Sequence, residues 1–238
     1  MKHCSKTHNI RGFSLIETVI AIGVLAVLLT GFMIVFAPAA AGIRKSINVQ
    51  EADRLATTLE QELVTFRTGD QGGNGFGKAF TWIEQSNQAA NALMIYQYRG
   101  SLSSTRPDGT PEPVPQISDK LPGKDYTLQT MVRRKSDTKF NDDLAAIEGS
   151  VYVVKCTQLV FNTGSGELKP GTPGQIQDPK NSGTKANNAD DYPEAVIAFA
   201  AEFHALPSKS PAYITNRLPQ TFTDLKNPVF TRNLAVRR

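Results

Sequence analysis

The sequence is poor in the residue types from which disulfides, metal centres and many active sites are built. Its 238 residues include two cysteines, Cys4 and Cys156, and three histidines. With two cysteines there is no disulfide framework and no paired CxxC motif, and neither HExxH nor GxSxG occurs. An enzyme should show polar residues that converge on a site, and none is visible here. We therefore expect no enzyme, no cofactor and no metal centre.

Charged side chains are missing from one long stretch near the N-terminus. No charged residue occurs between Thr18 and Ile43, and a helix that crosses a bilayer takes about 20 apolar residues. A secretory signal has a shorter apolar region, of about 7–15 residues, with a cleavage site after it, which does not fit this stretch. We predict a retained membrane helix; the alternative is a buried helix in the core of a globular domain.

One carboxylate, Glu17, stands at the start of this apolar stretch. A charge at the centre of a bilayer costs about 2.5–3.5 kcal/mol on insertion-based scales. An opposite charge would offset that cost. Alternatively, Glu17 lies at the lipid headgroups, near the helix N-terminus, where the helix dipole favours an anion.

Acidic residues are absent from the first twelve positions, which contain Lys2, Lys6 and Arg11. This basic flank favours a cytoplasmic N-terminus, although Arg44 and Lys45 beyond the apolar stretch oppose it. Removing the three basic residues from the 26 in the chain would leave 23 against 22 acidic residues, a net charge of +1. The sequence pI near 9.0 is therefore weak support for nucleic-acid binding, and we expect no nucleic-acid partner.

A short basic leader ends in Gly12, Phe13 follows, Glu17 stands five residues after the glycine, and a long apolar stretch comes next. This N-terminus resembles the prepilin signature of type IV pilins and of the pseudopilins of type II secretion systems. The resemblance covers about residues 11–45. The helix-kinking proline, Pro38, lies later than in many pilins, so we expect any kink to lie later as well.

The resemblance implies a role for each of these residues. A prepilin peptidase would cut between Gly12 and Phe13 and methylate the new amine of Phe13. Glu17 would then meet the positive N-terminal amine of a neighbouring subunit inside a helical filament. The implied partners are the peptidase, other pilin-like subunits and the inner membrane. The chain would cross that membrane once, with a cytoplasmic N-terminus, before it enters a filament in the periplasm or at the cell surface.

The rest of the chain predicts an α+β, pilin-like fold, in which one long N-terminal helix packs on an antiparallel sheet. Apolar residues recur at spacings near three and four up to Phe66, and glycines from Gly69 onward end the helix. The expected division is a leader at residues 1–12, a transmembrane and assembly helix at 13–45, and an extracytoplasmic globular domain at 46–238, with an amphipathic helix at 46–68 and a β-sheet domain at about 77–238.

Five segments have the composition of strands and indicate an antiparallel sheet: residues 92–98, 126–132, 151–161, 196–203 and 227–236. A short helix is expected over residues 142–148. The segments 100–125 and 163–193 exceed the usual length of a loop, so they are functional, disordered or contain short elements.

Residues 72–78, GGNGFGK, match the first seven positions of a phosphate-binding loop. The eighth position should be Ser or Thr and is Ala79, and the segment follows a helix instead of a strand. We interpret it as a flexible turn. We interpret His204, the only histidine after the leader, as a strand histidine with satisfied hydrogen bonds. The basic residues 133–135 and 237–238 are interpreted as solvated strand ends.

Two acidic clusters are possible calcium ligands, because calcium prefers oxygen donors. They are Asp142 with Asp143, and Asp190 and Asp191 with Glu194. Some pseudopilins bind calcium in a loop near the C-terminus, but neither cluster has the spacing of an EF-hand. We interpret both as solvated loop acids.

The sequence therefore predicts a structural subunit of a type IV pilus or pilus-like filament at the cell envelope. One alternative is a pseudopilin of a type II secretion system. A second is a binding domain that its N-terminal helix merely tethers to the membrane. A tether needs neither the Gly12–Phe13 junction nor Glu17, which favours the filament subunit.

Overall fold

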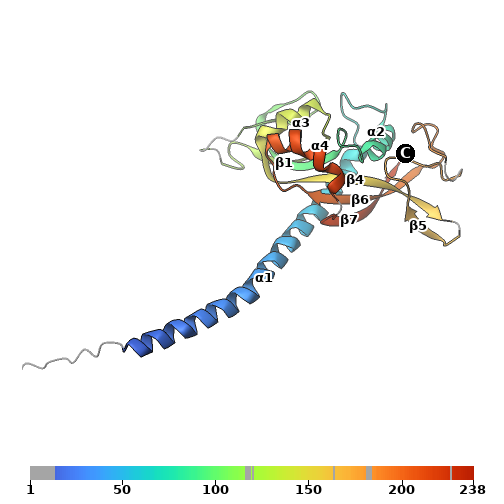
Figure 1. Cartoon of the computed structure of the whole chain (residues 1–238). Helices are drawn as coiled ribbons and strands as arrows, with labels where there is room; N and C mark the ends of the chain where they lie inside the picture. The colour runs from blue at the N-terminus through green and yellow to red at the C-terminus, as the bar shows by residue number, and fades with distance from the viewer. Residues whose placement is uncertain (1–13, 116–118, 120, 163, 181–183, 226) are drawn as a thin grey trace, which may run out of the picture. The chain divides into compact units, whose positions relative to one another are not determined.

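The computed structural model describes residues 14–238 except 116–118, 120, 163, 181–183 and 226 (Figure 1). The chain divides into two units, Met1–Ile47 and Asn48–Arg238. The helix α1 (Leu15–Val64) contributes its first part to the first unit and its last part to the second.

In the first unit, α1 exposes its apolar side chains. The segment Leu15–Phe36 is long and apolar enough to cross a membrane, and none of it is buried. A core helix would bury one face at least, so this exposure contradicts the alternative of a core helix. The helix is continuous through Pro38, although a proline removes one backbone hydrogen bond from a helix.

The second unit is built on an antiparallel sheet, and all five predicted strands are confirmed. β1 (Leu93–Thr105), β4 (Ile147–Asn162), β6 (Val196–Ala205) and β7 (Phe230–Arg237) pair in that order. Both β2 (Pro111–Pro113) and β3 (Thr127–Arg134) pair with β1, and β5 (Glu167–Pro170) pairs with the end of β4. The architecture is therefore α+β, as the sequence predicts.

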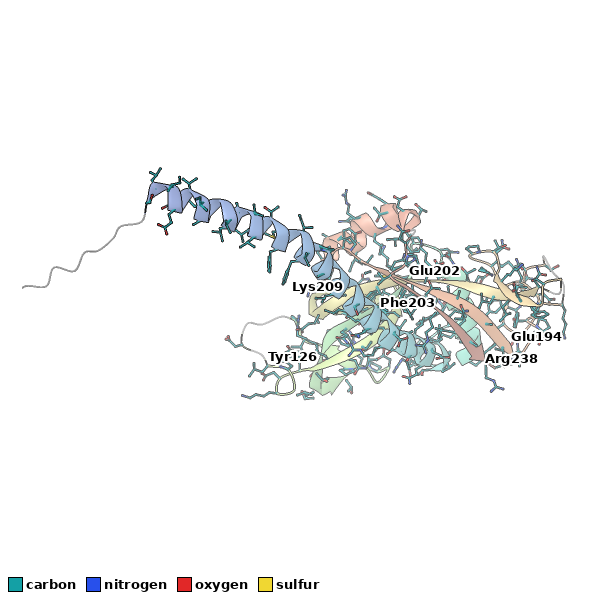
Figure 2. The ribbon with its side chains drawn as sticks, turned by 90° about the horizontal axis from the view of Figure 1, so that it is seen from below. Tyr126, Glu194, Glu202, Phe203, Lys209 and Arg238 are labelled. Carbon is teal, nitrogen blue, oxygen red and sulfur yellow. The ribbon has the colours of Figure 1, made fainter. Side chains whose placement is uncertain are left out.

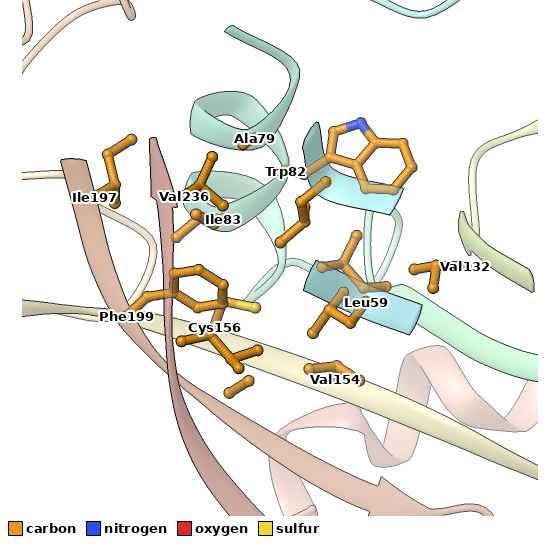
Figure 3. Close-up of a cluster of buried hydrophobic side chains, with 14 of the residues drawn as sticks. Leu59, Ala79, Trp82, Ile83, Val132, Val154, Cys156, Ile197, Phe199 and Val236 are labelled. Carbon is orange, nitrogen blue, oxygen red and sulfur yellow. The ribbon is translucent and has the colours of Figure 1, made fainter. Parts of the chain in front are cut away.

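One face of the sheet is covered by the last part of α1 and by α2 (Gly75–Gln85). The spacing of four residues puts Leu55, Leu59 and Leu63 on one stripe of α1, and all three are buried. They meet side chains of α2 and of β1, β4, β6 and β7, several of which Figure 3 shows. This is the packing of helix on sheet that the amphipathic pattern predicts.

The glycine-rich segment is not a flexible turn, so that prediction is wrong. Asn74 caps the N-terminus of α2, since its side-chain oxygen accepts a hydrogen bond from the Gly77 amide at 2.7 Å. Gly72 has φ +108, a left-handed conformation that favours glycine. A Cβ atom at Gly77 would lie 2.1 Å from the carbonyl oxygen of Gly72. These glycines therefore allow the backbone before α2 to pack against its first turn.

The other face of the sheet is also covered, which the sequence analysis did not predict. Over it lie α3 (Thr138–Asp143), η1 (Leu144–Ala146), η2 (Tyr213–Arg217), α4 (Leu218–Thr221) and η3 (Phe222–Asp224). Figure 1 shows α3 and α4 on the same side of the sheet. The helix expected over residues 142–148 instead begins at Thr138, because the Asp137 side chain accepts a hydrogen bond from the Lys139 amide. It is followed by η1, and β4 begins at Ile147.

The two long connecting segments contain short elements, one of the three outcomes expected for them. The first includes the end of β1 and all of β2, and the second includes β5. The second also buries Ile176, Ala186 and Tyr192 in the core. It is held by Gln158, whose amide group accepts from the Gln177 amide at 2.6 Å and donates to the Gln177 carbonyl at 3.0 Å.

The close approach at Gly77 predicts the sign of a stability change. In an ordinary helix, Gly→Ala is stabilising by about 0.5–1 kcal/mol. Here the added methyl group would meet the carbonyl of Gly72, so we expect Gly77→Ala to lower the free energy of unfolding by about 1–3 kcal/mol. Denaturation followed by circular dichroism measures this change. A stabilised Gly77→Ala variant would show that the backbone contact is absent.

Candidate functional site

The first unit holds the residues for which the sequence predicts processing and assembly. Gly12 and Phe13 lie outside the described residues. Ser14 is the first described residue, and its carbonyl accepts a hydrogen bond from the Thr18 amide at 3.1 Å. Glu17 lies in the first turn of α1 and is exposed. Among the described residues, none forms an ion pair with Glu17.

Apart from Glu17, the segment Leu15–Phe36 presents an apolar surface. The hydroxyls of Thr18 and Thr30 donate to the carbonyls of Ser14 and Ala26, four residues earlier, at 3.3 and 2.8 Å. Their polar groups are therefore satisfied within the helix, as an apolar environment requires. Glu17 is the single formal charge on a surface that is otherwise suited to lipid or to other helices.

The sequence profile of the prokaryotic N-terminal methylation motif matches residues 7–33. This range includes the end of the basic leader, the Gly12–Phe13 junction, Glu17 and the first part of the apolar helix. The chain has a prepilin-type N-terminus. No curated protein and no solved structure is significantly similar to it.

The prepilin-type N-terminus is the kind found in type IV pilins and pseudopilins, and it implies processing by a prepilin peptidase and assembly with other pilin-like subunits. Together with the apolar helix it supports anchoring in a membrane. The profile does not extend to the globular second unit. Any site in that unit has to be assessed from its own geometry.

The lysine of the glycine-rich segment is engaged within the protein. Lys78 is fully buried, and its Nζ lies 3.0 Å from Oε1 of Glu62, 2.9 Å from Oδ2 of Asp70 and 2.7 Å from the Thr65 carbonyl. The ammonium also lies 4.5 Å from the ring centroid of Trp82. Its three protons therefore have acceptors inside the fold. This lysine joins α1 to α2, and the arrangement is unlike that of a lysine that binds phosphate.

A second group of buried charges lies around Arg133. Its guanidinium contacts Asp108 at 3.3 Å and Asp143 at 3.3 Å, and Arg106 contacts Asp143 at 2.8 Å. Tyr96 donates its hydroxyl to Asp143. Arg133 and Asp143 are thus buried, which corrects their interpretation as a solvated strand end and a solvated loop acid; Asp142 is exposed, as expected.

These contacts shift several pKa values in the directions that charge pairing dictates. Burial opposes ionisation of Asp108, but hydrogen bonds from Lys139 and Thr110 and the charge of Arg133 outweigh it and lower the Asp108 pKa. Burial, followed by the charge of Asp143, raises the pKa of Tyr96. The carboxylates in this group therefore serve as partners for arginine and lysine.

The other candidates divide between exposed and buried positions. Asp190, Asp191 and Glu194 are exposed, and the Asn188 side chain accepts from the amides of both aspartates. Within the described residues, no three His, Cys, Asp or Glu side chains gather as metal ligands do. The terminal residues 237–238 are exposed, as predicted.

His204 departs from its prediction. It lies on β6, as expected, but it is 2% exposed and neither of its ring nitrogens has a hydrogen-bond partner among the described residues. The expectation of satisfied hydrogen bonds is wrong. The alternation of β6 by itself could not reveal this, because the residues that cover His204 are distant in the sequence.

The burial of Lys78 predicts a loss of stability when its charge is removed. Lys78→Met should lower the free energy of unfolding by about 1–3 kcal/mol, because the buried Glu62 and the Thr65 carbonyl each lose a hydrogen bond, while Glu62 keeps its ion pair with Arg67 at 2.8 Å. Denaturant titration measures this change.

A matched control for this test is Lys185→Met. Lys185 pairs with Glu84 at the surface, and such pairs contribute about 0–1 kcal/mol. If Lys78→Met and Lys185→Met lower the free energy of unfolding equally, the burial of Lys78 does not determine its contribution to stability.

Proposed function

We propose that the protein is a structural subunit of a type IV pilus or pilus-like filament at the cell envelope. The observation that carries the proposal is the prepilin-type motif at residues 7–33. It is followed by a helix whose apolar side chains are all exposed from Leu15 to Phe36. Lipid or protein has to cover such a surface. Lipid covers the helix while the subunit is in the membrane, and other subunits cover it in a filament.

In this proposal the chain first spans the inner membrane once, with its leader in the cytoplasm. The peptidase cuts between Gly12 and Phe13 and methylates the amine of Phe13. The cut creates a positive charge at the start of the helix, one turn from Glu17. Neighbouring helices can then pair the amine of one subunit with Glu17 of another, because a buried charge is tolerated when an opposite charge lies beside it.

The unpaired state of Glu17 supports this role. Buried ionisable groups of the second unit, such as Lys78 and Arg133, have partners within the chain. Glu17 has none among the described residues, which leaves it available to the amine of a neighbouring subunit. In this proposal the protein supplies contacts and does not catalyse a reaction.

The test of the general function is the location of the assembled protein. A tag at Ser165, in the exposed turn just before β5, should label filaments on the cell surface in electron micrographs. Short periplasmic assemblies together with impaired protein secretion would identify a pseudopilin. Label spread evenly in the membrane of a strain with a working assembly system would contradict both and favour a tethered binding domain.

The first specific prediction concerns processing. Mass spectrometry of the envelope form should find Phe13 at the N-terminus with one extra methyl group. Gly12→Val should leave an uncut precursor, because a side chain at this position would crowd the approach of the peptidase to the backbone. A mature chain that begins at Met1, or beyond Ile43, would contradict the proposal.

The second prediction separates assembly from processing. Glu17→Ala should be cut normally, accumulate as a membrane monomer and assemble poorly, because the amine of Phe13 would lose a partner worth several kcal/mol per contact. Glu17→Asp, shorter by one methylene group, should give an intermediate yield of filaments, measured by shearing and quantitative blotting.

The control for the second prediction is Glu60→Ala, which removes a carboxylate from the part of α1 that belongs to the globular unit. It should leave the yield unchanged. If Glu17→Ala assembles at the normal level, Glu17 is only a tolerated interfacial charge.

A further inference from the structure

The second face of the sheet is closed by a segment that we call the cap, residues 206–225. It connects β6 to β7 and contains η2, α4 and η3. Ile214, Leu218 and Phe222 are the buried side chains by which it contacts the sheet. The amide of Leu206 donates to the Val151 carbonyl at 2.9 Å, which fixes the start of the cap to β4.

The far end of the cap is held by one ammonium group. Lys155 of β4 donates to the carbonyls of Phe222 and Leu225, both at 3.0 Å, and its Nζ lies 4.7 Å from the ring centroid of Phe222. Phe222 begins η3 and Leu225 follows its last residue, and the Phe222 carbonyl also accepts from the Leu225 amide at 3.4 Å. The cap therefore depends on a positive charge beneath it.

His204 lies beside this lysine. It pairs across the strands with Val153, and Lys155 pairs with Glu202, so alternation places His204, Lys155 and Glu202 on the same face. Figure 2 labels Glu202 and Phe203 at successive positions of β6. Nε2 of His204 is 3.7 Å from Oε2 of Glu202, whose side chain is 45% exposed.

The groups that act on His204 come from three places: Lys155 on β4, Glu202 on β6 and the backbone of Asn227 after the cap. Burial, followed by the charge of Lys155, lowers the pKa of His204 below its ordinary value near 6.5, and Glu202 and Asn227 oppose this only in part. The ring is buried, and among the described residues neither of its nitrogens has a hydrogen-bond partner.

We propose that His204 and Lys155 form a pH-sensitive latch, in which protonation of His204 releases the cap from the second face of the sheet. A cation at His204 would lie in an apolar layer beside Lys155, the group that holds the end of the cap. Release lets water reach the ring and exposes the apolar side chains of the cap and of the sheet below it. The latch belongs to the globular unit, and it does not depend on the proposed function.

The direction of the pH dependence follows from linkage. Above about pH 6.5 the ring is neutral in the closed and in the open state, so pH has no effect through this group. Below that value the open state binds a proton that the closed state does not. The equilibrium constant for opening then rises by up to about tenfold per pH unit, until the pH reaches the lowered pKa of the closed state.

Hydrogen exchange with mass spectrometry tests the latch on the full chain in detergent micelles. Rates at pH 7.5 and pH 5.0 are corrected for the intrinsic exchange rate. Peptides from the cap should show a larger opening constant at pH 5.0 than at pH 7.5, while peptides from β1 and β3 stay unchanged. An equal increase in all of these peptides would indicate global unfolding and overturn the proposal, as would unchanged exchange in the cap.

Variants separate the two partners. His204→Leu should remove the pH dependence of exchange in the cap. If the leucine variant does not fold, His204→Gln is used in its place. Lys155→Met should raise exchange of the cap at pH 7.5 as well, whereas Lys169→Met, at an exposed position of β5, should not. If the pH dependence persists without His204, another group is responsible and the latch is refuted.

Discussion

The ammonium of Lys78, fully buried against Glu62 and Asp70, fixes how the second unit is assembled. A charge removed from water is tolerated only where opposite charges and hydrogen-bond acceptors surround it. That requirement holds the end of α1, the turn after it and the first turn of α2 at one spacing. The close backbone contact between Gly72 and Gly77 then follows, because a side chain at either position would separate these segments. The leucine stripe of α1 supplies the apolar contact area, and the ion pairs determine its position.

Buried charges on the opposite face of the sheet also need opposite charges and hydrogen-bonding partners around them. Arg133 and Asp143 are buried as members of one group that also includes Asp108 and Arg106. This group joins α3 to β3 and to the turn before β2. The helix that covers this face is therefore held by polar contacts as well as by the apolar cluster around Tyr96 and Phe140. His204 is the exception among these buried polar groups, since it has no hydrogen-bond partner in the described part of the chain. A polar group in that condition is stable only while it stays neutral, which makes this face the one that responds to protons.

In the described part of the first unit, Glu17 has no partner of opposite charge, and it is exposed on an apolar helix. In the proposed filament, the partner is the amine that cleavage before Phe13 would create on another subunit. Processing and assembly would then be linked by charge: before the cut there is no amine to pair with, and after it an unpaired carboxylate and an unpaired amine favour association. The globular unit, whose buried charges are paired within the chain, would not take part in that step.

The sequence by itself determined the motif, the long N-terminal helix and the five main strands, but not α2 or the helices over the second face. The prepilin-type N-terminus and the apolar helix are visible because their signals are local, a fixed spacing from Gly12 to Glu17 and an uninterrupted apolar run. The five strands are visible for the same reason, since alternation and β-branched content lie within each segment. Only the tertiary structure decided the state of the polar residues. Lys78, Arg133 and Asp143 stand in segments interpreted as turns and solvated ends, and His204 follows a predicted strand, yet all four are buried. Burial depends on which distant segments cover a residue, and the partners of Lys78 and Arg133 lie up to 25 residues away in the chain; no local pattern encodes that distance.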